Sequence, residues 1–270
     1  MTNRSQSGRQ KAAVSTTKAI DINKKKKVTN CLSLLLVLFS ALLLSPTAAA
    51  QEKIRLIVDT DAMAEIDDQA AITYALFSGN HFEVEGITVN RGSDGPHRTD
   101  RDQDIDDHFN EAVTVARLCA SSNVPVLKGP AGNYRSVKDH VNNPTFDGSD
   151  AVNFIIQRAH ATSRRKLNIY AIGNLTNVAL ALWKDPTIAN KIVVWWMGTW
   201  HPANFAENNM AGDLDAASAL LANPQNVPFN IIPGNIPNMG TTWDEYSQRM
   251  RGRGPNISPA VSTRYGPYTR

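Results

Sequence analysis

The chain has 270 residues, with 28 lysines and arginines against 25 aspartates and glutamates, so its formal net charge at pH 7 is +3. Residues 1–50 hold eight of the basic residues and one acidic residue, which leaves 20 basic and 24 acidic residues, or −4, in residues 51–270. That part has no basic face to indicate nucleic-acid binding. Its one cysteine, Cys119, excludes an internal disulfide and is typical of a small buried side chain.

Residues 1–50 have the order of features found in a secretory signal peptide. A basic run at 24–27 precedes an apolar stretch of thirteen residues at 32–44, and alanines at 48–50 offer a cleavage site before Gln51. The apolar stretch is short for a membrane span. We therefore expect a secreted or periplasmic protein with a cleaved leader and no stable membrane anchor. An uncleaved N-terminal anchor is the second interpretation.

Strand and helix patterns alternate along residues 51–235. Strands are expected at 54–58, 84–89, 124–127, 167–172, 191–197 and 227–232, and helices at 70–77, 109–120, 149–161, 177–183 and 216–221. Alternating units of this size form right-handed βαβ crossovers. The sequence thus predicts one α/β domain with a doubly wound, mainly parallel sheet. An irregular tail rich in glycine, proline, asparagine and arginine is expected at 236–270.

Four carboxylates gather where the first strand gives way to the first helix. They are Asp59, Asp61, Asp67 and Asp68. Ligands of open α/β sheets bind beyond the carboxyl ends of the strands, which is where this cluster falls. Acids so close together repel one another unless a cation neutralises them, and a hard cation such as Ca²⁺ prefers several oxygen ligands. The cluster therefore predicts a calcium site.

Four sequence blocks follow one another along the domain. They are DTDAMAEIDDQAA at 59–71, AIGNLTNVALAL at 171–182, IVVWWMGTW at 192–200 and AENNMAGDLDAA at 206–217. In this order they resemble the inosine-uridine-preferring nucleoside hydrolase family. The resemblance implies that family's Rossmann-like fold and a calcium-dependent N-ribohydrolase, which cleaves purine or pyrimidine nucleosides to ribose and free base. Together with the leader, it predicts that this enzyme is exported. Because the family commonly forms dimers or tetramers, it also implies a homo-oligomer.

The resemblance assigns the calcium site to three positions. Asp61 would bind the ion and activate the attacking water, Asp68 would be the second carboxylate, and Ile172 would offer its backbone carbonyl. A bound divalent ion lowers the pKa of water, and a nearby carboxylate can accept the proton. For Asp59, a structural role as hydrogen-bond acceptor is the preferred interpretation. Five residues separate Asp61 from Asp67, where the usual family loop has three.

The resemblance assigns the ribose hydroxyls of the substrate to Asp67, Glu207 and Asn209, with Asn90 as a further candidate. Asp67 also suits the N-cap of the helix that follows, and the two roles are compatible. His201 stands where the family usually has an asparagine. It would contact substrate or act as an acid, because histidine titrates near neutrality, or it is a solvated loop residue.

The end of the chain departs from the family pattern. Family members carry a late His-Asp pair that completes the calcium shell and assists the leaving base, and this chain has no histidine after His201. The expectation is a C-terminally truncated or frameshifted chain, a site completed by a partner, or lost catalysis. The alternative function is therefore a catalytically impaired nucleoside- or sugar-binding relative. A haloacid dehalogenase-type phosphatase is disfavoured, because Met63 stands where that class needs threonine or valine.

Overall fold

The structure is a computed structural model that describes residues 52–64, 66–92, 105–200, 207–222 and 225–234. The expected leader at 1–50 and the expected tail at 236–270 both lie outside these residues. Within the described ranges, no helix has the length and apolar character needed to cross a membrane.

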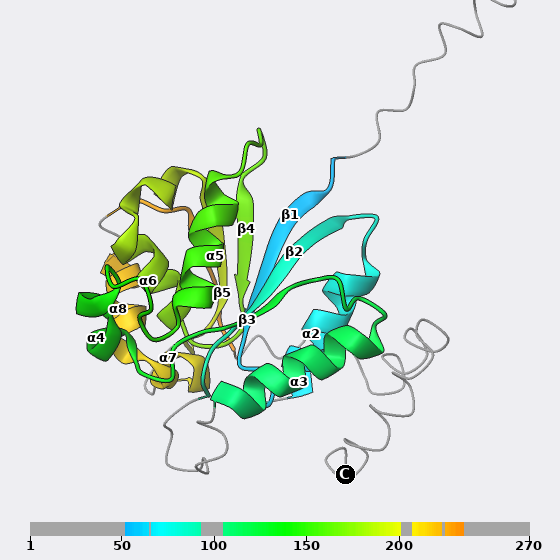
Figure 1. The fold of residues 1–270 in the computed structure, drawn as a ribbon, viewed down its shortest axis with the longest axis horizontal. Coiled ribbons are helices and arrows are strands. Elements are labelled where there is room, and N and C mark those ends of the chain that lie inside the picture. Colours follow the sequence, from blue (N-terminus) through cyan, green and yellow to red (C-terminus); the bar gives the residue numbers. More distant parts are fainter. Residues whose placement is uncertain (1–51, 65, 93–104, 201–206, 223–224, 235–270) are drawn as a thin grey trace, which may run out of the picture. The chain divides into compact units, whose positions relative to one another are not determined.

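Six parallel strands form one sheet in the order β3-β2-β1-β4-β5-β6 (Figure 1). The strands are β1 Ile54–Thr60, β2 Phe82–Val89, β3 Val126–Lys128, β4 Leu167–Ala171, β5 Ile192–Met197 and β6 Phe229–Ile232. Each predicted strand overlaps one of these, so the predicted doubly wound, parallel sheet is confirmed.

Helices cover both faces of the sheet. They are α2 Ile66–Phe77, α3 Ile105–Leu118, α4 Tyr134–Val137, α5 Ser149–His160, α6 Thr176–Lys184, α7 Asn208–Gly212 and α8 Leu214–Ala222, with 3-10 turns η2 Lys138–His140 and η3 Pro186–Asn190. In Figure 1, α2 and α3 lie together on one side of the sheet, and α5, α6 and α8 lie on the other. The sequence predicted the longer helices but not α4, α7, η2 or η3, which are too short to show a helical period.

The first strand shows why the sheet is buried on both faces. Leu56 and Val58 belong to the apolar cluster beneath α2 and α3, whereas Ile57 belongs to the cluster beneath α5 and α6. All three side chains are at most 2% exposed. An uninterrupted apolar run is typical of a parallel strand with helices on both faces. Cys119 is buried beside Thr73, and burial raises the pKa of its thiol to about 11, which agrees with a structural role.

A buried ionic cluster joins β1, β2 and α5 at the amino-terminal end of the sheet. The Arg55 guanidinium donates to both carboxylate oxygens of Glu85, with Nε 2.5 Å from Oε1 and Nη2 3.1 Å from Oε2. Arg158 Nε donates to Glu85 Oε2 at 2.5 Å. The Arg55 and Glu85 side chains are only 4% and 3% exposed, so the cluster fixes the packing of three elements.

The strand order places a topological switch point between β1 and β4. From β1 the chain moves outward through β2 and β3, and it then returns to the other side of β1 as β4. At such a point the connections leave the sheet in opposite directions and open a crevice at the carboxyl ends of the strands. The residues that follow β1 and β4 are therefore the place to look for a site.

Candidate active site

Asp59 anchors the carboxyl end of β1. Its fully buried carboxylate accepts hydrogen bonds from Thr88 Oγ1 at 2.6 Å, Asn90 Nδ2 at 2.8 Å and Asn177 Nδ2 at 2.8 Å. Burial raises the pKa of Asp59 to about 6, although these three donors each act to lower it. The carboxylate ties β1 to β2 and α6, as expected of a structural acceptor.

Asp61 lies at the switch point, against the glycine that follows β4. A Cβ atom placed on Gly173 would lie 2.8 Å from Asp61 Oδ1 and 3.0 Å from the Asp61 backbone nitrogen. The two segments also share a backbone hydrogen bond, from Ile172 N to Asp59 O at 2.8 Å. Asp61 is 3% exposed, and Gly173 leaves room for its carboxylate because glycine has no Cβ atom. We call this contact between Gly173 and Asp61 the glycine cradle.

The glycine cradle can be tested by filling it. We predict that Gly173→Ala displaces the Asp61 carboxylate and lowers kcat/KM for the riboside hydrolysis expected from the sequence resemblance on the order of 10²-fold, because small misplacements of a reacting group are costly. Steady-state assays with a nitrophenyl riboside would measure the loss. Gly79→Ala is the matched control, since a Cβ there meets nothing within 4 Å. Equal activity of the two variants would contradict the assigned role of the cradle.

The two acids in the first turn of α2 have different environments. Asp68 is 3% exposed, and its Oδ1 accepts from Thr60 Oγ1 at 2.5 Å, which ties it to the residue before Asp61. Asp67 is exposed. Because α2 begins at Ile66, Asp67 lies inside the first turn, and the N-cap interpretation is wrong. The helix dipole favours both negative charges at this end.

Two side chains hold the long loop between Asp61 and Asp67. The Met63 N–H donates to Nδ1 of His108 at 3.0 Å, and Gln69 Nε2 donates to the Ala62 carbonyl at 2.9 Å. His108 is fully buried on α3. His108 was not among the predicted site residues because the helix was expected to start at residue 109, whereas α3 starts at Ile105. Its signal is the apolar stripe into which it falls, formed by Ile105, Ala112, Val115 and Ala116.

Asn209 joins the ends of β4 and β5. Its Nδ2 donates to the Ile172 carbonyl and to the Met197 carbonyl, both at 2.9 Å. These bonds use both amide hydrogens, so only the side-chain oxygen is left to accept from a ligand. Asn209 thus lies next to the carbonyl expected to bind calcium. A carbonyl has two lone pairs, so Ile172 can still serve a cation.

Glu207 acts as a helix cap in this structure. Its Oε1 accepts from Asn209 N at 3.0 Å and its Oε2 accepts from Met210 N at 3.2 Å, at the start of α7. The expected sugar-binding carboxylate is therefore also structural, although each oxygen keeps capacity for a hydroxyl. Asp213 caps α8 in the same way, through Ala216 N at 3.1 Å.

Asn90, which donates to Asp59, has a side-chain oxygen that is not yet used. The side chain is 1% exposed, and its Nδ2 is engaged by Asp59. Its Oδ1 is buried and has no hydrogen-bond partner among the described residues. Buried polar atoms in native proteins are nearly always satisfied, so such an oxygen suits a ligand hydroxyl or a hard cation. His201 lies outside the described residues, and its predicted role stays a prediction.

Residues 56–265, which are most of the chain, match the sequence model of the inosine-uridine preferring nucleoside hydrolases. The chain belongs to this family. The resemblance drawn from the four sequence blocks is thereby confirmed.

Two relatives come from Oryza sativa subsp. japonica. Probable uridine nucleosidase 2 is 28% identical over 189 residues, which cover 62% of this chain and 52% of the relative. Probable uridine nucleosidase 1 is 28% identical over 220 residues, covering 73% and 63% respectively. The match therefore spans about half of the length of the first relative and less than two thirds of the length of the second.

Solved structures support the fold. A plant nucleoside hydrolase has 25% sequence identity and a TM-score of 0.52, and the match covers 68% of this chain and 61% of that chain. An inosine-guanosine nucleoside hydrolase has 18% identity and a TM-score of 0.62, covering 80% and 72% respectively.

The oxygen types near the switch point of this nucleoside hydrolase family member are those that a hard metal ion prefers. Within the described residues, no three histidine, cysteine, aspartate or glutamate side chains gather in a way that could hold a metal. The candidate ligands are instead oxygens of mixed type: the Asp61 and Asp68 carboxylates, the Ile172 carbonyl and the Asn90 amide oxygen. Carboxylate, carbonyl and amide oxygens together suit a hard divalent cation such as Ca²⁺.

Proposed function

We propose that this protein is an exported, calcium-dependent N-ribohydrolase that cleaves the N-glycosidic bond of nucleosides. The observation that carries the proposal is the placement of two buried carboxylates, Asp61 and Asp68, at the β1/β4 switch point, with Asp61 seated against Gly173. Membership of the nucleoside hydrolase family supports the reaction class. The relatives named as probable uridine nucleosidases support a nucleoside substrate.

The chain's own residues would carry the water-activation step. A water molecule attacks C1′ of the ribose, the bond from C1′ to the base nitrogen breaks with its electron pair going to the base, and Asp61 accepts the proton of the water. Asp61 and Asp68 would hold the divalent cation, which when bound lowers the pKa of a water molecule. Asp59 keeps the end of β1 fixed through its three side-chain donors.

The hydrogen bonds of the site favour a ligand rich in hydroxyl donors. The amide hydrogens of Asn209 are used by backbone carbonyls, and the Asn90 amide nitrogen is engaged by Asp59. The two asparagines can therefore offer a ligand only their acceptor oxygens, and Asp67 and Glu207 also offer acceptor oxygens. A ribose presents hydroxyl hydrogens, so the remaining acceptors complement it.

The proposal is tested with chelator-stripped protein and two substrates. We expect one saturable calcium site by calorimetric titration, calcium-dependent release of nitrophenol from a nitrophenyl riboside, and slower turnover of inosine. The activated substrate is favoured because a good leaving group needs no acid. Calcium heats at background level up to millimolar concentration, with the fold intact, would reject the metal assignment.

A second function follows from the catalytic groups of the sequence. The family carries a late His-Asp pair that assists the leaving base, and this sequence has no histidine after His201. Binding of calcium and ribose without turnover of either substrate would establish the catalytically impaired binding relative instead.

Export rests on the leader pattern at 32–50 alone. N-terminal sequencing of the protein recovered from the cell envelope should begin at Gln51. A membrane-retained chain that still begins near Met1 would reject cleavage.

A further inference from the structure

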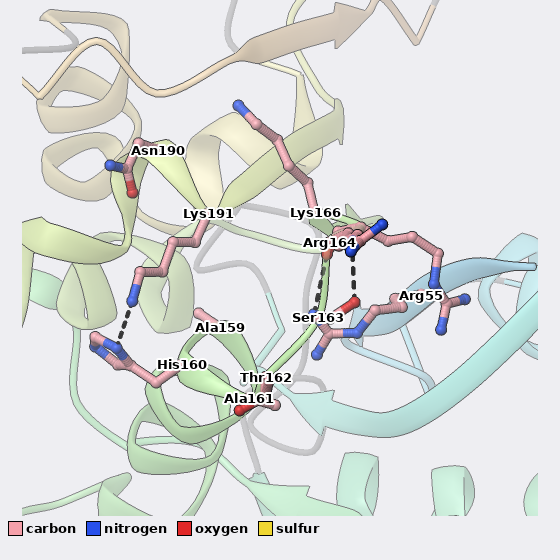
Figure 2. Close-up of a pocket in the computed structure, with 11 residues that line it drawn as sticks. Arg55, Ala159, His160, Ala161, Thr162, Ser163, Arg164, Lys166, Asn190 and Lys191 are labelled. Carbon is pink, nitrogen blue, oxygen red and sulfur yellow. Dashed lines mark hydrogen bonds between the residues drawn. The ribbon is translucent and has the colours of Figure 1, made fainter.

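A hollow lies at the end of the sheet opposite the candidate active site. Its volume is about 430 Å³, and it is bounded by the end of α5, the loop that follows, the residues before β5 and the start of β1 (Figure 2). Its lining includes five lysine and arginine side chains and no carboxylate; these cations are Arg55, Arg164, Arg165, Lys166 and Lys191. The residues that line the hollow therefore include cations but no anion, and the proposed hydrolase reaction uses none of them.

Two of the lining cations are fixed by the fold. Besides binding Glu85, Arg55 donates to the Arg165 carbonyl at 3.2 Å and to the Arg158 carbonyl at 2.7 Å, so four of the five guanidinium hydrogens are used. Arg165 pairs with Glu83 at 2.8 Å and also donates to the Lys53 carbonyl. These two arginines form a rigid wall whose charge is largely neutralised.

The other three cations are not neutralised by a direct carboxylate contact. The side chains of Arg164 and Lys166 are exposed and have no hydrogen-bond or ion-pair partner within the described part of the chain. Lys191 Nζ lies 2.7 Å from His160 Nδ1, a contact drawn as a dashed line in Figure 2. His160 Nε2 in turn lies 2.7 Å from an Asp185 oxygen, which orients the ring.

Capping of α5 does not explain these charges. The carbonyl of Arg158, in the last turn of that helix, already accepts from Arg55 Nη2 and from the Ala161 backbone nitrogen. Cations near a helix C-terminus normally act on such carbonyls. The side chains of Arg164 and Lys166 donate to no carbonyl of the described residues, so they do not cap α5.

We propose that this hollow binds a small phosphate-bearing anion with two or more negative charges. Arginine and lysine are the side chains that recognise phosphate oxygens, and Arg164 and Lys166 are paired with no carboxylate of the described residues. A hollow of about 430 Å³ has the size of a small-molecule site. Ribose is uncharged, so this second site goes beyond the proposed hydrolase function.

Inorganic pyrophosphate is the probe that tests the site on the full chain. Calorimetric titration at low ionic strength should show one saturable site, and binding should weaken at 0.2 M salt because exposed charges are screened. The double variant Arg164→Ala/Lys166→Ala should bind at least tenfold more weakly. The matched control is Arg117→Ala/Arg135→Ala, which removes the same charge from exposed positions outside the hollow and should bind as the native protein does.

The outcomes separate this site from the active site. Absence of saturable binding at millimolar pyrophosphate, or equal weakening in both double variants, would overturn the proposal. A nucleoside diphosphate and vesicles containing phosphatidylglycerol distinguish the source of the phosphate, and binding to vesicles alone would also overturn it. Arg164→Gln/Lys166→Gln repeats the test with polar side chains if the alanine variant unfolds. Riboside hydrolysis reports on Asp61 independently, so a failure here leaves the proposed function standing.

Discussion

Replacement of Asp61 by asparagine should abolish hydrolysis of a chromogenic riboside while the fold stays intact. In the proposed mechanism the carboxylate binds the divalent cation and accepts the proton of the attacking water, and an amide cannot accept that proton. Loss of a general base typically lowers the rate on the order of 10²–10⁴-fold, and weaker metal binding would deepen the defect. Steady-state kinetics on the native protein and the variant would measure the change.

The control for this variant removes the same charge elsewhere. Asp139→Asn lies on η2 with a side chain that is 69% exposed, and it should leave kcat/KM within about twofold of native. Calorimetric titration of Asp61→Asn with calcium separates the two roles of the carboxylate. A variant that hydrolyses the riboside at the native rate would remove Asp61 from the mechanism.

The sequence predicted the fold because its signals are local. The buried run that becomes β1 and the alternation of strand and helix patterns require only neighbouring residues to be read. The meeting of Asp61 with Gly173 agrees with the same alternation, since Asp61 follows β1 directly and Gly173 lies two residues after the end of β4. The end of the sheet at which the candidate site lies is therefore predictable from the sequence alone.

Hydrogen-bond partners from distant elements could not be predicted. Asn177 donates to Asp59 across 118 residues of sequence, and His108 accepts from Met63 across 45 residues. Neither pairing has a periodic signal, because each depends on how a helix packs onto a strand end. The loop of Met63 is held by contacts that only the packed structure reveals.

The structural roles of Glu207 and Asn209 could not be predicted from the sequence either. A sequence motif assigns Glu207 and Asn209 to the sugar, but in the fold the same atoms cap α7 and tie β4 to β5. A carboxylate near the start of a helix can cap the helix or accept a hydrogen bond from a sugar hydroxyl. The sequence does not show which of its oxygens already accepts a hydrogen bond.

Removal of the buried carboxylate at position 85 should destabilise the protein more than the loss of any exposed ion pair. Burial alone raises the pKa of Glu85, but hydrogen bonds and attraction from Arg55 and Arg158 outweigh it and hold the pKa below its usual value. Glu85→Gln would leave the Arg55 guanidinium, whose side chain is 4% exposed, without a charge partner. Breaking a buried pair in this way typically costs 3–5 kcal/mol, so we expect a loss of about 3–5 kcal/mol in the free energy of unfolding.

The pH dependence has a definite sign. Because the folded-state pKa of Glu85 lies below the ordinary value of 4.5, its stabilisation is present above pH 4.5 and is lost as pH falls through the folded pKa. Urea denaturation at neutral and acidic pH should therefore show the native protein and Glu85→Gln converging in acid.

Glu83→Gln is the matched control for the buried cluster. It lies on the same strand and also pairs with an arginine, Arg165, but the two side chains are 48% and 32% exposed. An ion pair in water of this kind is worth at most about 1 kcal/mol. Equal destabilisation by the two substitutions would show that burial does not govern the cluster. A clear difference would establish that β1, β2 and α5 depend on one desolvated carboxylate for their junction.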